Sequence, residues 1–167
     1  GPAGLAVAGR LRRKGLDFEI VEQSKTITPT WYAHYDRLHL HTIKEFSHLP
    51  HRPFPEETPR YVPKNDLLRY FEQYAEDFDI RPHFEEEVVS IEKIGEQWRS
   101  ETASGKGFLS DNVVICTGYN RLPHRPTWDG QDEFHGPMVH KKKKKNAEPY
   151  AGQKVLIIGM GNSGAEI

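Results

Sequence analysis

The chain has 167 residues, a net charge of −1 and 28% charged residues. This balance excludes the broad basic field that binding to nucleic acid or an anionic membrane requires. Cys116 is the single cysteine, so the chain can form no internal disulfide and no redox-active cysteine pair, and a cytoplasmic location is expected. No apolar run reaches the roughly 18 residues of a membrane-spanning helix, so we expect no membrane partner.

The chain begins within a glycine-rich motif. Residues 1–9 read as the back of a nucleotide-binding loop without its first strand, and we expect the chain to be a piece of a longer protein. Leucine and alanine recur at helical spacing and predict a helix over Pro2–Lys14 that stops at Gly15. Asp17–Glu22 is a predicted strand. Glu22 ends it about 20 residues after the loop, where such motifs place an acceptor for a ribose hydroxyl.

The middle of the chain predicts one long helix and several short strands. Residues 35–41 alternate leucine with polar residues, a strand pattern. Asn65 is predicted to cap an amphipathic helix over 65–79, and Trp98 and Trp128 are expected in the core. Further strands are predicted at Val88–Ile94, Gln97–Thr102, Phe108–Leu109 and Val113–Cys116, the last of which enters Thr117-Gly118.

A second glycine motif ends the chain. The apolar run Val155–Ile158 leads into Gly159-x-Gly161-x-x-Gly164. Glycines at these positions allow a tight turn and a close approach to a pyrophosphate, which the following helix N-terminus then binds. The alternatives are an ordinary strand-to-helix turn here and a solvated strand end at Glu22. Two such loops in one chain indicate two cofactors that exchange a hydride.

Several motifs occur in the order seen in flavin-containing monooxygenases, and the chain resembles this family, above all its plant YUCCA-type members and their bacterial relatives. They are Gly1-Pro-Ala-Gly4, Glu22, Thr28-Pro-Thr-Trp31, Tyr35–His41, Pro53-Phe-Pro55, Cys116–Tyr119 and Gly159–Gly164. Phe134-x-Gly136-x-x-x-His140 also resembles the front of the motif that identifies the family.

The resemblance implies an α/β fold. Residues 1–150 would form a Rossmann-like FAD-binding domain, with a parallel sheet, helices and a small antiparallel β element, and residues 151–167 would begin an NADPH-binding domain. The residues expected to bind FAD are Gly1, Pro2, Ala3, Gly4, Glu22, Gln23, Trp31, His41, Thr42, Val88, Thr117 and Gly118. Those expected to bind NADPH are Gly159, Met160, Gly161, Asn162, Ser163 and Gly164.

The activity that the resemblance implies is insertion of one oxygen atom from O2 into a small organic substrate. It would use FAD and NADPH and proceed through a C4a-(hydro)peroxyflavin, with no catalytic side chain and no metal. The substrate is either a keto acid of the indole-3-pyruvate type or a small amine or sulfide. Animal-type members carry an asparagine close to the position of His41, so the histidine here disfavours animal-type amine oxidation.

Two other functions remain open. A flavin disulfide reductase has the same two-dinucleotide layout, although its redox cysteine pair is absent from this chain. A non-catalytic nucleotide-binding remnant is favoured by the run Lys141–Lys145, in which Lys144 stands where the family has an aromatic residue. That run is either a tolerated surface loop or a basic patch near the NADPH phosphates.

Four histidines are also candidate metal ligands. His39 and His41 would share one strand face, with His48 and His51 nearby, but no matching set of carboxylates or cysteines accompanies them. Surface and loop histidines are the expected outcome.

Overall fold

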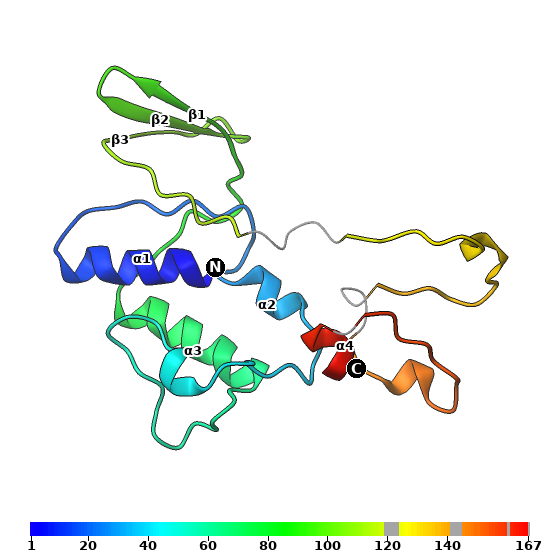
Figure 1. Ribbon diagram of the computed structural model, residues 1–167. Helices are drawn as coiled ribbons and strands as arrows, with labels where there is room; N and C mark the ends of the chain where they lie inside the picture. The colour runs from blue at the N-terminus through cyan, green and yellow to red at the C-terminus, as the bar shows by residue number, and fades with distance from the viewer. Residues whose placement is uncertain (119–123, 141–144, 160, 167) are drawn as a thin grey trace.

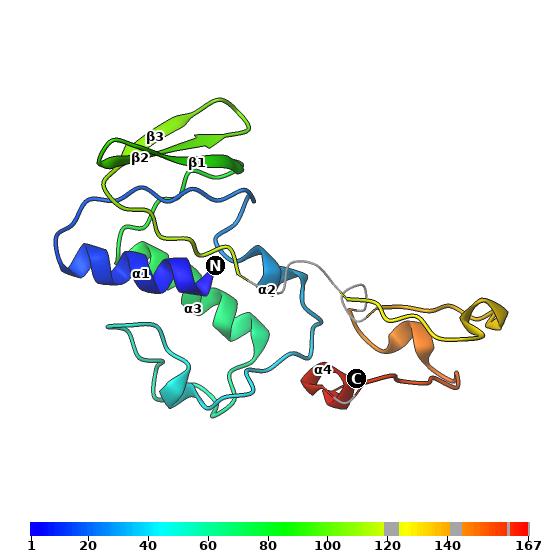
Figure 2. The same ribbon diagram turned by 45° about the horizontal axis from the view of Figure 1, so that its top comes forward.

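The computed structural model describes residues 1–118, 124–140, 145–159 and 161–166. Helices α1 (Pro2–Arg13) and α3 (Lys64–Asp77) lie at one end of the body and a small three-stranded sheet lies at the other. The connecting segments 17–24 and 111–118 run between them, and residues 124–158 extend from the body as an arm (Figures 1 and 2).

The core lies between the two long helices. The predicted apolar face of α3 is confirmed, with Leu67, Leu68, Phe71, Tyr74 and Ala75 all buried. The predicted first helix and its stop are also confirmed. Gly15 adopts φ +67°, and the helix ends there because glycine accepts this left-handed conformation without steric cost.

The start of α3 differs from the prediction. Asn65 was expected to cap the helix, but the N-cap is Pro63 and no side chain caps the first turn. The N–H of Lys64 donates to the Leu38 carbonyl at 2.8 Å. The N-cap therefore lies two residues earlier than predicted, and Asn65 lies within the first turn.

A glycine brings α1 and α3 into close contact. A Cβ atom on Gly9 would lie 1.9 Å from the Tyr74 hydroxyl oxygen. Tyr74 is fully buried, and its hydroxyl donates to the Pro50 carbonyl at 3.0 Å. The tyrosine ring is therefore held in place, and only glycine leaves room for it at this position of α1.

The small sheet confirms three predicted strands. It is an antiparallel meander of β1 (Val88–Ile94), β2 (Gln97–Thr102) and β3 (Gly107–Ser110). Val88 pairs with Thr102, and the register shifts at an irregularity between Val88 and Ser90.

The described residues form no parallel sheet, so this part of the expected fold is not confirmed. Segment 17–22 makes a single parallel bridge, Val21 to His83. Segments 113–116 and 155–158 pair with no strand in the described part of the chain, and a strand without a hydrogen-bonded neighbour is not a ladder.

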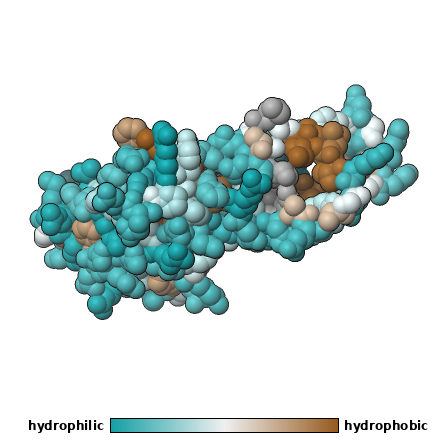
Figure 3. Space-filling model, turned by 90° about the horizontal axis from the view of Figure 1, so that it is seen from below, coloured by the Kyte–Doolittle hydropathy of each residue, from teal (hydrophilic) through white to brown (hydrophobic). Residues whose placement is uncertain are grey.

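Unpaired apolar segments are accordingly exposed. Ile115 is 70% exposed and Leu156 is 84% exposed. Figure 3 shows that the most hydrophobic part of the visible face lies on the arm, whereas the body is mostly hydrophilic. Trp128 also lies in the arm and is 45% exposed, so its expected place in the core is wrong. Trp98, in β2, is half-buried.

The remaining elements are short. They are α2 (Pro29–Ala33), η1 (Lys44–Phe46), η2 (Gln131–Glu133), η4 (Glu148–Tyr150) and α4 (Asn162–Glu166). The strand expected at 35–41 is reduced to one antiparallel bridge, His39 to Pro63. None of the described helices is both long and apolar enough to cross a membrane.

Candidate functional site

A small pocket opens where α1 begins. Gly1 and Gly4 line it together with Glu22, which the sequence analysis assigned to the same site. The structure thus brings together residues 21 positions apart at a helix N-terminus, where unpaired backbone N–H groups favour an anion. The other lining residues are apolar: Leu5, Ile20, Ile27, Ile80 and Pro82.

Backbone and side-chain bonds hold Glu22 in this pocket. Its N–H donates to the His83 carbonyl, and its own carbonyl accepts from the Glu86 N–H, each at 3.0 Å. One carboxylate oxygen accepts from the Ser24 N–H at 3.0 Å. The other lies 3.9 Å from the Gly1 nitrogen. The carboxylate therefore faces the glycine loop, as a ribose acceptor would.

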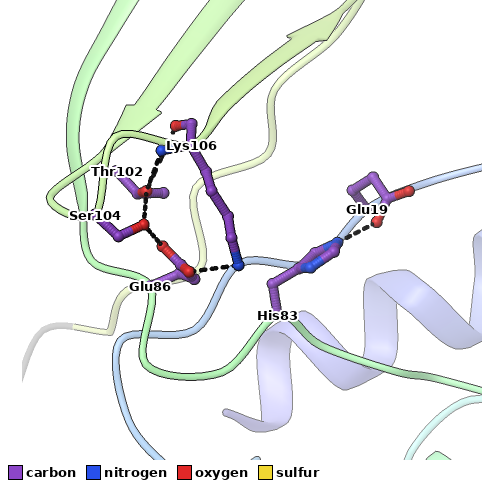
Figure 4. A network of polar contacts seen from close by, with 6 residues as sticks. All are labelled: Glu19, His83, Glu86, Thr102, Ser104 and Lys106. Atoms are coloured by element: carbon purple, nitrogen blue, oxygen red, sulfur yellow. Dashed lines mark hydrogen bonds and ion pairs between the residues drawn. The ribbon is translucent and has the colours of Figure 1, made fainter.

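A polar network anchors the small sheet to the segment that pairs with Glu22 (Figure 4). The Glu86 carboxylate accepts from Lys106 and from Ser104, each at 2.6 Å. Hydrogen bonds from Lys106, Ser104 and Thr102 lower the pKa of Glu86 to about 2. In the same view His83 contacts Glu19 at 2.7 Å.

Segment 113–118 passes the same loop. A Cβ atom on Gly4 would lie 3.7 Å from the Cβ of Cys116. Thr117 and Gly118 follow directly and are both exposed, so they leave the body beside the start of α1.

The other residues expected near FAD are not among those that line this pocket. Trp31, in α2, stacks edge-on against Phe71 with ring centroids 6.1 Å apart. Gln23 is exposed next to Glu22, and Val88 follows Glu86 by two residues. Thr42 instead bonds Ser47, with 2.6 Å between the two hydroxyl oxygens.

The second glycine loop has the packing that its motif requires. A Cβ atom on Gly164 would lie 2.3 Å from the Gly159 carbonyl oxygen, whereas one on Gly161 would meet nothing within 4 Å. The third glycine thus allows helix and loop to approach closely, and the second leaves open space in front of the backbone. Met160 lies outside the described residues.

His41 lies against this second loop. Its Nε2 is 3.0 Å from a carboxylate oxygen of Glu166, and its Nδ1 is 2.6 Å from the Asn162 side-chain nitrogen. The other Glu166 oxygen accepts from the Tyr35 hydroxyl. Segment 35–41 is therefore in direct contact with α4. The position of His41 relative to FAD stays a prediction.

The lysine run is described only at its last residue, because 141–144 lie outside the described residues. Lys145 Nζ donates to the carbonyls of Tyr32, Ala33 and His34, at 3.3, 2.9 and 3.4 Å. It thus binds the C-terminal end of α2, where a cation is electrostatically favoured.

The histidines considered as metal ligands have other contacts. His39 Nδ1 lies 2.7 Å from the Arg37 carbonyl oxygen, and His48 Nδ1 lies 3.0 Å from the Leu49 carbonyl oxygen. The described residues contain no group of three or more histidine, cysteine or acidic side chains that could hold a metal.

Sequence reasoning missed the apolar lining of the pocket and the burial of Thr28. The apolar lining of the pocket carries no motif, because it comes from three separate segments. Thr28 is 1% exposed, and its hydroxyl has no hydrogen-bond partner within the described residues. Thr28 directly precedes Pro29 at the start of α2, and this position was the sequence feature that could have drawn attention to it.

Comparison with known proteins places the chain in a family. The profile of the pyridine nucleotide-disulphide oxidoreductases matches residues 1–167, and the chain belongs to this family. Its resemblance to flavin monooxygenases is confirmed by a relative named probable indole-3-pyruvate monooxygenase YUCCA3, from Arabidopsis thaliana. The two are 41% identical over 179 residues, which cover 100% of this chain and 41% of the relative. The chain thus spans less than half the length of that relative.

Solved structures agree on the fold. A variant of the flavin monooxygenase from Stenotrophomonas maltophilia has a TM-score of 0.88 and 29% identity, covering 99% of this chain and 50% of that one. This similarity implies a Rossmann-like FAD-binding fold, as predicted. A bacillithiol disulfide reductase from Staphylococcus aureus has a TM-score of 0.81 and 25% identity, covering 99% of this chain and 49% of that one.

Proposed function

We propose that the protein containing this chain is a monooxygenase that uses FAD and NADPH to insert one oxygen atom from O2 into a small organic molecule. The observation that carries the proposal is the pocket in which Gly1, Gly4 and Glu22 meet at the start of α1. The second loop, with Gly164 against the Gly159 carbonyl, supports a second dinucleotide.

The residues fit these cofactors. The first loop would bind the FAD pyrophosphate with backbone N–H groups, and Glu22 would accept hydrogen bonds from the ribose. The open space at Gly161 would admit the NADPH pyrophosphate. FAD would supply the redox chemistry by taking a hydride from NADPH and reacting with O2. The protein would hold the cofactors and exclude water.

The substrate class that we favour is an indole-3-pyruvate-type keto acid. The support is the named activity of the Arabidopsis relative at 41% identity, together with a histidine at position 41. A cytoplasmic location remains a prediction as well.

The test is purification of the protein from its complete reading frame. We expect a visible flavin spectrum, bleaching of that spectrum by NADPH without oxygen, and one ¹⁸O atom from ¹⁸O₂ in the product formed from indole-3-pyruvate. A protein that binds no flavin would overturn the proposal and favour the non-catalytic remnant.

The flavin disulfide reductase stays the second candidate because of the Staphylococcus aureus neighbour. The single cysteine of the chain argues against a redox pair within this span. NADPH-dependent reduction of a low-molecular-weight disulfide, without oxygen transfer to any organic substrate, would favour it.

A further inference from the structure

Helix α4 follows directly on the second glycine loop. Its described residues are Asn162–Glu166, and none of them is buried. Side-chain contacts at its surface join it to the rest of the structure.

Those contacts come from segment 35–41. Tyr35 donates to one oxygen of the Glu166 carboxylate, and His41 Nε2 lies 3.0 Å from the other. The Asn162 amide nitrogen lies 2.6 Å from His41 Nδ1. His41 thus lies between Asn162 and Glu166, the first and last described residues of α4, and contacts both.

Segment 35–41 is itself firmly held. The Leu40 N–H donates to the Val62 carbonyl at 2.9 Å, and the Leu38 carbonyl accepts from the Lys64 N–H at 2.8 Å. Leu38 is buried, and Tyr35 is only 7% exposed. Burial, and then the hydrogen bond to Glu166, raise the pKa of Tyr35 to about 12, so its hydroxyl stays protonated and able to donate.

We propose that Tyr35, His41 and Glu166 form a clamp that positions the second glycine loop against segment 35–41. The views in Figures 1 and 2 agree that α4 lies beside the chain that follows α2. This inference rests on the proposed function, in which the loop binds NADPH. Hydride transfer requires the donor and acceptor atoms within about 3.5 Å, so a displaced loop would slow it.

The first arm of the test measures the clamp without any turnover. Hydrogen–deuterium exchange of the complete protein reports the Gly164 and Ala165 amides, which donate to the Gly161 carbonyl. Tyr35→Phe keeps the buried ring and removes one bond, and Glu166→Ala removes two. We expect both variants to exchange at least about fivefold faster than wild type. Exchange equal to wild type in both would overturn the clamp, even in a protein that binds no FAD.

The second arm measures positioning in the flavin-loaded protein. Tyr35→Phe and Glu166→Ala should each raise the KM for NADPH and slow anaerobic flavin reduction by at least about fivefold, with FAD affinity unchanged. The double variant should be no slower than Glu166→Ala alone, because both changes break one unit.

Two variants serve as controls. Glu166→Gln keeps an acceptor for His41 and a polar partner for Tyr35, so it should recover most of the lost rate. Tyr61→Phe changes a tyrosine that is 47% exposed and should behave as wild type. Faster exchange combined with unchanged NADPH kinetics in Tyr35→Phe and Glu166→Ala would overturn the positioning role. Wild-type protein that binds FAD but is not reduced by NADPH would instead refute the proposed function.

Discussion

Glu22 is held by the fold in an orientation that suits the ribose-binding role we propose for it. One of its carboxylate oxygens accepts from Ser24 N–H within the turn, and the other faces Gly1. The first bond fixes the rotamer, so the second oxygen stays directed at the pocket. A ligand hydroxyl bound there would meet a charged acceptor that is already oriented.

We predict that Glu22→Ala weakens FAD binding in the complete protein. Loss of a hydrogen bond to a charged group costs about 1.5–3 kcal/mol, roughly a 10- to 100-fold rise in Kd. Equilibrium dialysis against FAD measures it. Glu19→Ala is the matched control, because Glu19 is an exposed carboxylate of the same segment that bonds His83 instead. Equal FAD affinity in wild type and Glu22→Ala would remove Glu22 from the site.

At the residue scale, sequence reasoning worked where a motif has fixed spacing. Gly1, Gly4 and Glu22 meet in one pocket because α1 and the segment 17–22 that follows it have the lengths that the motif requires. It could not foresee that His41 contacts Asn162 and Glu166, more than a hundred residues away in the chain. Such contacts depend on how distant segments of the chain pack together, and the local spacing of residues does not predict this packing.

At the scale of elements, the contact between α1 and α3 depends on the lack of a side chain at Gly9. We predict that Gly9→Ala destabilises the protein by about 1–2 kcal/mol, because the clash with buried Tyr74 outweighs the better helix propensity of alanine. Urea unfolding measures the change. Gly107→Ala is the control, since an added Cβ there meets nothing within 4 Å. A Gly9→Ala protein as stable as wild type would contradict this packing.

The network around Glu86 predicts a pH dependence. Its pKa is lowered to about 2 by its bonds to Lys106, Ser104 and Thr102. A carboxylate with a lowered folded-state pKa stabilises the fold above its unfolded pKa near 4.5 and loses that contribution as pH falls toward 2. Wild type should therefore be more stable than Glu86→Gln at pH 7, and the difference should shrink between pH 4.5 and pH 2.

Urea unfolding of both proteins at a series of pH values measures that difference. If the difference in free energy of unfolding between wild type and Glu86→Gln stays constant down to pH 2, the lowered pKa assigned to Glu86 would be contradicted. Glu133→Gln, on a side chain of the exposed arm, is the control and should show no such gap.

The short antiparallel strands were predictable because each pairs with its neighbour in the chain. Val88–Ile94 and Gln97–Thr102 have the bounds expected from their alternation. The parallel pairing of strands could not be predicted in the same way, since a parallel ladder needs a partner from a distant segment. An apolar run such as Val155–Ile158 predicts a buried strand, but it does not indicate which other segment of the protein packs against it.

At the scale of the whole molecule, those uncovered runs have a consequence. Ile115 and Leu156 are 70% and 84% exposed, and contiguous exposed apolar surface promotes association. We predict that the isolated 167-residue chain binds the dye ANS and self-associates, as measured by fluorescence and light scattering. Leu156→Thr should reduce both signals. A monomeric chain that binds no dye would show that these side chains are covered in solution.

The central claim is that the two glycine loops serve two different cofactors. Gly161→Ala tests it most directly, because an added Cβ meets no protein atom within 4 Å and so should leave the fold intact. In anaerobic stopped-flow reduction of the complete protein, we predict normal FAD content and a KM for NADPH raised roughly tenfold, equivalent to about 1.4 kcal/mol of binding free energy. A variant that loses FAD, or that NADPH reduces with wild-type kinetics, would contradict the account.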